Sequence, residues 1–226
     1  MPEVSKMTKC IFITATGTDI GKTYISALIV KKMREEGLNC GYYKPILSGA
    51  VNGIPGDCKY VTETAGLNCN PMNCLTYCFE EAVSPHLAAK RQNIVISKEK
   101  ILEDFKSKQQ EYDYLLIEGA GGITCPINIE NKYLMNDLIK DMGTDIVIVA
   151  DGGLGTINSV LLTVEYAQKR NINIRGIILN NYKDNFMYED NVISIEKLTG
   201  LNILTTVQRN DTDIKINKKI FKELEK

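Results

Sequence analysis

Short apolar runs rich in β-branched residues recur along the chain, and they constrain its fold more than any other feature. Each run is followed by glycine or polar residues and then by a segment with apolar residues at helical spacing. Strands are predicted at 10–14, 40–43, 114–117, 146–150, 176–179 and 201–205, and helices at 23–36, 101–105, 134–142, 160–167 and 193–198. Strands that are apolar throughout must be covered on both faces. The alternation therefore predicts an α/β fold with a parallel sheet flanked by helices on both faces.

The 226 residues are predicted to form a single domain, with residues 1–8 as a flexible N-terminal extension. Residues 48–71 are rich in glycine and proline and are predicted to be a loop that holds a short helix at 58–65. The composition, 44% hydrophobic and 24% charged residues, excludes a disordered or fibrous chain.

The charge and cysteine content restrict the partners and the compartment. A formal net charge of −1 provides no positive field for a polyanion, so nucleic acid is not an expected partner. Seven cysteines occur without a signal peptide or a membrane-spanning apolar run, which indicates a cytoplasmic protein with no membrane contact. The spacing of Cys69, Cys74 and Cys78 matches no common zinc or iron–sulfur pattern, and a metal–thiolate site is not expected.

A predicted strand gives way to a predicted helix at Gly21, Lys22 and Thr23. Backbone N–H groups at such a junction, together with the positive end of the helix dipole, form a cradle for phosphate. Lys22 would neutralise the β and γ phosphates of ATP, and the Thr23 hydroxyl would bind Mg²⁺. The common P-loop has its first glycine where this chain has Thr16. A chance Gly-Lys-Thr is the alternative, but its position between strand and helix favours a phosphate site.

The strand at 114–117 is followed by Glu118, Gly119, Ala120 and Gly121. Ligands of open α/β sheets gather at the carboxyl ends of strands, where a carboxylate can bind Mg²⁺ and glycines let a nucleotide approach the backbone. The alternative is a solvated strand end with a flexible turn.

Two further charged residues are candidates with common alternative explanations. Lys44 ends a predicted strand and would bring a second ammonium to the phosphates, although a single lysine is usually exposed to solvent. Asp57 would supply a second carboxylate for the metal, although by itself it is typical of a turn.

Taken in order, these residues resemble the dethiobiotin synthases, the ATP-dependent carboxylases of biotin biosynthesis. The resemblance covers most of the chain, through Gly21-Lys22-Thr23, Tyr43-Lys44-Pro45, Ser48-Gly49, Asp57, Ser84-Pro85-His86, Glu118-Gly119-Ala120-Gly121-Gly122, Leu154-Gly155-Thr156-Ile157-Asn158 and Asn180. The family's loop commonly has glycine at the position of Ala15 and aspartate at that of Gly17. Its C-terminal adenine-binding turn usually contains proline, which is absent from 206–210 here.

The resemblance implies a role for each matched residue. Lys22 and Lys44 would be catalytic, and Thr23, Asp57 and Glu118 would hold Mg²⁺. Nucleotide contacts would come from Asp19, Ile20, Gly21, Lys22, Thr23, Asp57, Glu118, Gly119, Ala120, Gly121, Asn180 and Asn181. Substrate contacts would come from Thr18, Ser48, Gly155, Thr156, Ile157 and Asn158, the last four reaching the substrate of the other subunit in a homodimer with a shared active site.

The family reaction joins CO₂ to 7,8-diaminononanoate and forms a carbamate, which attacks the γ-phosphate of ATP. The second amine then closes the ring of the carbamic-phosphoric anhydride, giving dethiobiotin, ADP and phosphate. Two lysines and a divalent cation suit this chemistry, because phosphoryl transfer depends on positioning and charge stabilisation. The reaction needs no nucleophilic side chain, and the sequence has no evident Ser-His or Cys-His arrangement.

Three other functions are weighed against this one. Cobyrinate and cobyric acid amide synthases belong to the same superfamily but usually carry a glutaminase domain, for which this chain has no room. Partitioning ATPases typically have an extra lysine before the glycines of the loop, where this chain has Thr14, Ala15 and Thr16. A binding module without a nucleotide is the third alternative, and Lys22 with Glu118 argues against it.

Overall fold

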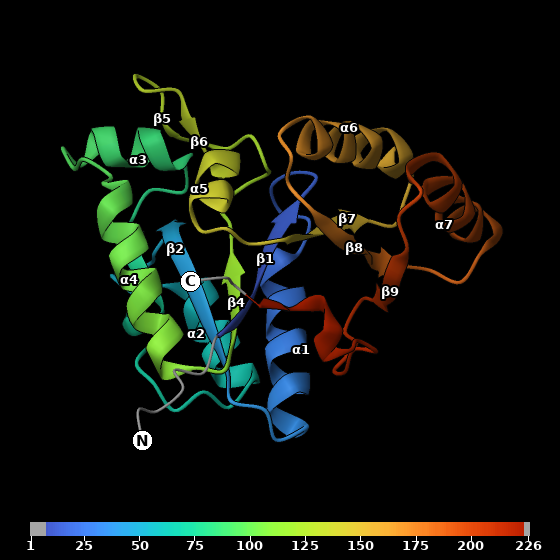
Figure 1. Cartoon of the computed structure of the whole chain (residues 1–226), viewed down its shortest axis with the longest axis horizontal. Coiled ribbons are helices and arrows are strands. Elements are labelled where there is room, and N and C mark those ends of the chain that lie inside the picture. Colours follow the sequence, from blue (N-terminus) through green and yellow to red (C-terminus); the bar gives the residue numbers. More distant parts are fainter. Residues whose placement is uncertain (1–7, 224–226) are drawn as a thin grey trace.

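The computed structural model describes residues 8–223, and its centre is a sheet of seven parallel strands in the order β3-β2-β4-β1-β7-β8-β9 (Figure 1). The strands are β1 (Lys9–Ala15), β2 (Cys40–Ser48), β3 (Leu75–Phe79), β4 (Tyr114–Glu118), β7 (Ile146–Asp151), β8 (Ile174–Tyr182) and β9 (Ile203–Gln208). Strand β10 (Lys222–Glu223) pairs antiparallel with β1, and β5 (Pro126–Asn128) pairs with β6 (Tyr133–Leu134) in a separate hairpin.

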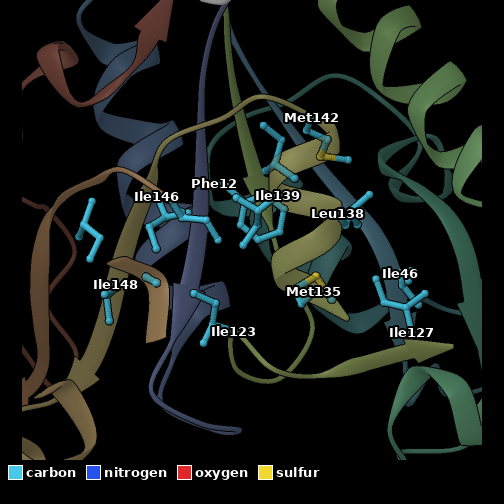
Figure 2. Packing of buried hydrophobic residues seen from close by; sticks show 14 of the residues in the cluster. Phe12, Ile46, Ile123, Ile127, Met135, Leu138, Ile139, Met142, Ile146 and Ile148 are labelled. Carbon is cyan, nitrogen blue, oxygen red and sulfur yellow. The ribbon is translucent and has the colours of Figure 1, made fainter. Parts of the chain in front are cut away.

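Helices cover both faces of this sheet. They are α1 (Lys22–Glu35), α2 (Gly56–Thr64), α3 (Pro85–Arg91), α4 (Lys98–Glu111), α5 (Met135–Asp141), α6 (Thr156–Lys169) and α7 (Phe186–Thr199), with short 3₁₀ turns at Pro71–Cys74 and Lys218–Ile220. Helices α3 to α7 contribute to one hydrophobic cluster, part of which is drawn in Figure 2, and α1 and α2 contribute to the other. The predicted fold class is therefore confirmed.

Strand β1 shows why the sequence required two covered faces. Successive side chains of a strand point to opposite faces, so Cys10 and Phe12 enter the cluster under α3 to α7, whereas Ile11 and Ile13 enter the cluster under α1 and α2. All four are fully buried. Burial of a large apolar side chain stabilises the fold by about 1.5–3 kcal/mol. A strand that is buried on both faces gains this at every position, and so its sequence is apolar without alternation.

All six predicted strands differ from their predicted bounds by one or more residues, and two of these differences have a local cause. Lys44 does not end its strand, because β2 continues through Pro45 to Ser48. The strand pairs with β4 along its first part and with β3 from Lys44 onward, and Pro45 is a paired position in neither register, so its missing N–H is tolerated. Strand β9 begins at Ile203 rather than at residue 201. Gly200 ends α7 in a left-handed conformation, and the next two residues connect the helix to the strand.

The predicted flexible extension lies outside the described residues except for Thr8. That residue is 6% exposed, and its hydroxyl donates a hydrogen bond to the Tyr112 carbonyl at 3.0 Å. Between residues 8 and 223, no helix has both the length and the apolar character required to cross a bilayer.

Candidate active site

The loop between β1 and α1 is shaped by two residues in left-handed conformations. Asp19 has φ 58° and Gly21 has φ 95°, and Gly21 is the N-cap of α1. A Cβ atom on Gly21 would lie 2.2 Å from the Asn180 Nδ2 atom, so both the backbone angle and the space require glycine. The loop therefore leads directly into the first turn of α1, where backbone N–H groups are available to an anion.

The Lys22 ammonium lies against this loop. The side chain donates to the Gly17 carbonyl at 3.3 Å, and the residue is only 7% exposed. Burial lowers the pKa of the Lys22 ammonium, while the Glu118 charge acts in the opposite direction. A triphosphate bound in the loop would supply the negative charge that the buried ammonium needs.

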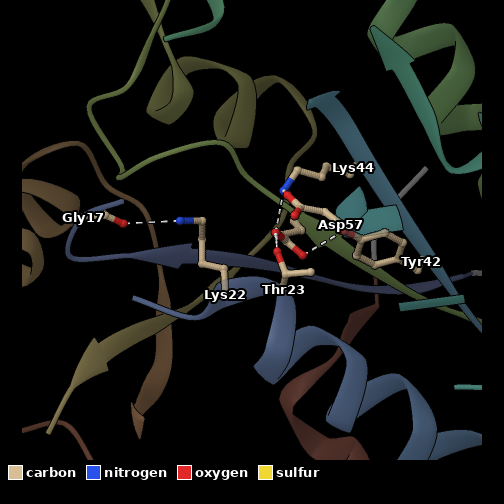
Figure 3. A network of polar contacts seen from close by, with 7 residues as sticks. Gly17, Lys22, Thr23, Tyr42, Lys44 and Asp57 are labelled. Carbon is tan, nitrogen blue, oxygen red and sulfur yellow. Dashed lines mark hydrogen bonds and ion pairs between the residues drawn. The ribbon is translucent and has the colours of Figure 1, made fainter. Parts of the chain in front are cut away.

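Glu118, at the carboxyl end of β4, is the centre of a buried polar network. Figure 3 shows its partners Thr23, Tyr42 and Lys44 gathered at one point. The Glu118 Oε1 atom accepts hydrogen bonds from the Thr23 hydroxyl and the Lys44 ammonium, both at 2.7 Å. Its Oε2 atom accepts one from the Tyr42 hydroxyl at 2.8 Å. The Lys44 ammonium also contacts Asp57 Oδ2 at 2.5 Å. Side chains of α1 and β2 thus meet at the Glu118 carboxylate of β4, and α2 joins the network through Asp57 and Lys44.

The Lys44 ammonium lies between two carboxylates. Burial alone would lower the pKa of Lys44, but the charges of Glu118 and Asp57 outweigh burial and raise its pKa. Lys44 is 5% exposed and Glu118 is fully buried. Lys44 is therefore a permanent cation at neutral pH, in contrast to the exposed lysine that its sequence position alone would suggest.

The oxygen atoms at this network fit a magnesium ion. The Thr23 hydroxyl donates to Glu118, and the carboxylates of Asp57 and Glu118 both accept from the Lys44 ammonium. Magnesium prefers oxygen ligands and usually takes one or two carboxylates together with substrate phosphates. Within residues 8–223, no group of three or more His, Cys, Asp or Glu side chains is arranged to hold a metal by itself. A metal here would therefore depend on the nucleotide to complete its ligands.

A cavity of about 790 Å³ opens beside the network. It brings together most residues that the sequence singled out: Thr18, Asp19, Gly21, Lys22, Thr23, Lys44, Ser48, Asp57, Glu118, Gly119, Ala120 and Gly121. The Ser48 Oγ atom is buried there without a hydrogen-bond partner in the described chain, which leaves it free for a polar ligand. The volume is ample for a small organic substrate beside a phosphate.

The cavity also has walls that sequence reasoning did not assign. They are Tyr24, Tyr60, Ala82, Val83, Ser84, Pro85 and Cys125. Ser84 and Pro85 carried a signal, because a Ser-Pro pair is typical of a helix start, and Pro85 does begin α3. Tyr60 carried none, since it follows Asp57 on α2 and one exposed tyrosine on a surface helix is unremarkable.

Seven of the predicted ligand residues lie outside this cavity, namely the six described next and Ile20. The Asn180 amide donates to the Ile20 carbonyl at 2.9 Å, and its Oδ1 atom is buried without a partner in the described chain. The Asn181 amide donates to Asp151 Oδ2 at 2.8 Å. The remaining four, Gly155, Thr156, Ile157 and Asn158, form the cap and first turn of α6, away from the cavity walls. Ile20, which contributes a carbonyl to Asn180, is likewise not a wall residue.

Other proteins of known structure share this fold at low sequence identity. A ParA family ATPase from Chlorobium tepidum TLS covers 91% of this chain and 85% of its own, with TM-score 0.56 and 14% identity. The MinC:MinD cell division protein complex of Aquifex aeolicus gives TM-score 0.55 at 16% identity, over 89% of this chain and 81% of that one. Residues 9–214 match the family model described as AAA domain. The fold and the loop at Lys22 place the chain in the class of P-loop nucleotide-dependent proteins.

Sequence identity to named relatives is much higher. The chain belongs to the ATP-dependent dethiobiotin synthetase family. It is 50% identical over 215 residues to the ATP-dependent dethiobiotin synthetase of Clostridium botulinum strain Alaska E43, spanning 92% of this chain and 95% of that protein. It is 46% identical over 209 residues to the Clostridium perfringens strain 13 enzyme, spanning 90% and 92%. The resemblance drawn from the motifs is confirmed, and the chain is an ATP-dependent ligase of biotin biosynthesis.

Proposed function

We propose that this enzyme uses ATP and Mg²⁺ to carboxylate 7,8-diaminononanoate with CO₂ and to close the product into the cyclic urea of dethiobiotin. The observation that supports this best is the pair of buried ammonium groups, Lys22 and Lys44, at one cavity with two carboxylates. One ammonium neutralises ATP phosphates, and the other serves the carbamate that attacks them. Unpartnered Ser48 would accept a hydrogen bond from a substrate amine.

The proposed steps balance without a protein nucleophile. A neutral amine of the substrate forms an N–C bond to CO₂ and releases a proton, giving a carbamate. A carbamate oxygen attacks the γ-phosphorus, and the bond to the ADP oxygen breaks. The second amine, also neutral, then attacks the carbonyl carbon and releases a proton, phosphate leaves, and the ring closes. Lys44 would stabilise the carbamate and the transferring phosphoryl group, and Lys22 would stabilise the β and γ oxygens of ATP.

A divalent cation would be held by the Thr23 hydroxyl and the carboxylates of Asp57 and Glu118, and it would neutralise charge on the triphosphate. For Glu118 and Asp57 to bind the cation, the Lys44 ammonium that now bridges them at 2.7 and 2.5 Å would turn toward the carbamate. The two carboxylates would then bind the divalent cation in place of the Lys44 ammonium.

The reaction as a whole is tested by its substrate requirement. Phosphate release from ATP by the purified enzyme is expected only when CO₂ and 7,8-diaminononanoate are both present, because the carbamate is the attacking group. The measurement is steady-state phosphate release with each substrate omitted in turn, in buffer degassed of CO₂ for one arm. Robust ATP turnover without the diamine would count against the proposal.

A homodimer with shared active sites is part of the proposal. The first turn of α6 lies outside the cavity of its own subunit, so its predicted substrate contacts would be made in the other subunit. Leu154, just before this turn, is 93% exposed, and Asn158 is exposed as well. Both side chains are therefore accessible to a second subunit.

Sharing is tested by mixing two inactive variants. Lys44→Gln disables the subunit that holds the nucleotide, and Asn158→Ala disables the contact made by the other subunit. In mixed dimers one of the two sites has neither change, so refolding the variants together is expected to restore about a quarter of wild-type activity. The measurement is diamine-dependent phosphate release before and after mixing. If the mixture stays as inactive as either variant, each site is formed within one chain.

A further inference from the structure

The Tyr42 hydroxyl is a buried polar group to which none of the preceding steps gives a role. Tyr42 is 1% exposed and lies near the start of β2, inside the hydrophobic cluster under α1 and α2. Alternation along the strand puts Tyr42 and Lys44 on the same face of the sheet, and Tyr43 on the opposite face. Both same-face side chains reach Glu118 on the neighbouring strand β4.

The two oxygens of Glu118 have different partners. Oε1 accepts from Thr23 and from Lys44, and it faces the cavity residues. Oε2 accepts from Tyr42, its one hydrogen-bond donor among the described residues. Tyr42 is not a wall of the cavity. The tyrosine therefore binds the carboxylate oxygen that is not shared with Thr23 and Lys44, and it does so from outside the cavity.

The carboxylate can be oriented by such a contact because it is fully buried. A buried charged oxygen without a donor is costly, so Oε2 is held where the Tyr42 hydroxyl lies. Fixing one oxygen fixes rotation about the last bond of the glutamate side chain. The other oxygen then has a single orientation, toward Thr23 and Lys44.

We infer that Tyr42 is a positioning residue, which holds Glu118 Oε2 so that Oε1, the oxygen that accepts from Lys44 in this structure, is presented to the divalent cation once Lys44 has turned away. The inference rests on the proposed function of Glu118 as a metal ligand. Hydrogen bonds behind metal ligands commonly affect affinity or activity by about 10- to 100-fold. Tyr42 acts through Glu118 and does not touch the reacting atoms.

The test is Tyr42→Phe, which removes the hydroxyl and keeps the ring. The dissociation constant of Mn²⁺ is measured in the presence of a non-hydrolysable ATP analogue, and an increase of about 10- to 100-fold is expected. In turnover assays, the Mg²⁺ concentration for half-maximal rate is expected to rise in parallel, with the KM for the diamine unchanged.

The neighbouring residue supplies a matched control. Tyr43 is also fully buried, and its hydroxyl donates to the Ile101 carbonyl at 3.1 Å on the opposite face of the sheet. Tyr43→Phe therefore removes one buried tyrosine hydroxyl from the same strand without touching Glu118. It is expected to lower the melting temperature while leaving the Mn²⁺ dissociation constant at the wild-type value.

Equal Mn²⁺ affinity in the Tyr42→Phe and Tyr43→Phe proteins would overturn the inference and leave Tyr42 as a core residue. If Tyr42→Phe does not fold, Tyr42→Met provides a flexible apolar side chain without the hydroxyl, and the same increase is expected. The binding measurement uses no diamine or CO₂. A wild-type protein that binds Mn²⁺ with the nucleotide analogue but fails the substrate test would contradict the proposed reaction and not the role of Tyr42.

Discussion

Lys44→Gln is expected to lower kcat/KM for the diamine by about 10²- to 10³-fold, the loss typical of removing one preorganised group that stabilises charge in a transition state. The ammonium is buried, and the neighbouring carboxylates raise its pKa, so the substitution replaces a buried positive charge with a neutral amide. The measurement is steady-state kinetics at saturating ATP and Mg²⁺. The KM for ATP should change much less, because Lys22 remains.

Lys59→Gln is the control for that variant. Lys59 lies on α2, its side chain is 50% exposed, and its ion pair with Glu63 spans 3.8 Å. Such a surface pair contributes little, so kinetics indistinguishable from wild type are expected. An unchanged kcat/KM in the Lys44→Gln protein would remove Lys44 from the catalytic residues.

Glu118→Gln is expected to lower the free energy of unfolding by about 3–5 kcal/mol, because it removes one partner of a buried ion pair. The Lys44 ammonium would lose the fully buried carboxylate that it contacts at 2.7 Å and keep only Asp57. The measurement is denaturant unfolding at neutral pH in the presence of a chelator, so that no divalent cation contributes. Affinity for Mg²⁺ with ATP should fall as well.

Asp57→Asn separates the structural effect from the metal effect. Its side chain is 44% exposed, so loss of its contact with Lys44 is expected to change the unfolding free energy by less than about 1 kcal/mol. Affinity for Mg²⁺ should nevertheless fall, since both carboxylates are proposed ligands. Equal destabilisation by the two substitutions would show that burial does not set the strength of these contacts.

The features that could be predicted from sequence are those encoded in neighbouring residues. The strand, loop and helix around Gly21 follow one another directly, and so do the apolar run and the carboxylate at Glu118. Strand β3 was not predicted because its residues are mostly half-buried at the edge of the sheet and mix polar with apolar side chains. Helix α3 was missed because its buried face consists of Pro85, Ala88 and Ala89, which form no stripe of large apolar side chains.

Tyr42 illustrates why the rest was not predictable. A tyrosine inside an apolar strand matches the pattern of a core residue, and Tyr42 does pack in the core. Its contact with Glu118 exists only because β2 pairs with β4, which brings together residues 76 positions apart. The same holds for Lys44, whose burial depends on α2 and β4 as well as on its own strand. Contacts of this kind cannot be predicted from the residues adjacent in sequence.

The position of β1 in the middle of the sheet has a consequence for how the enzyme forms. Its neighbours β4 and β7 follow it by more than about a hundred residues, as the pairs Ile13 with Glu118 and Phe12 with Ile146 show. Contacts between such distant segments make folding slow, because long loops must close first. The nucleotide site is thus assembled only after most of the chain has been synthesised. ATP can therefore retard unfolding of the finished enzyme, but it has no site from which to guide the nascent chain.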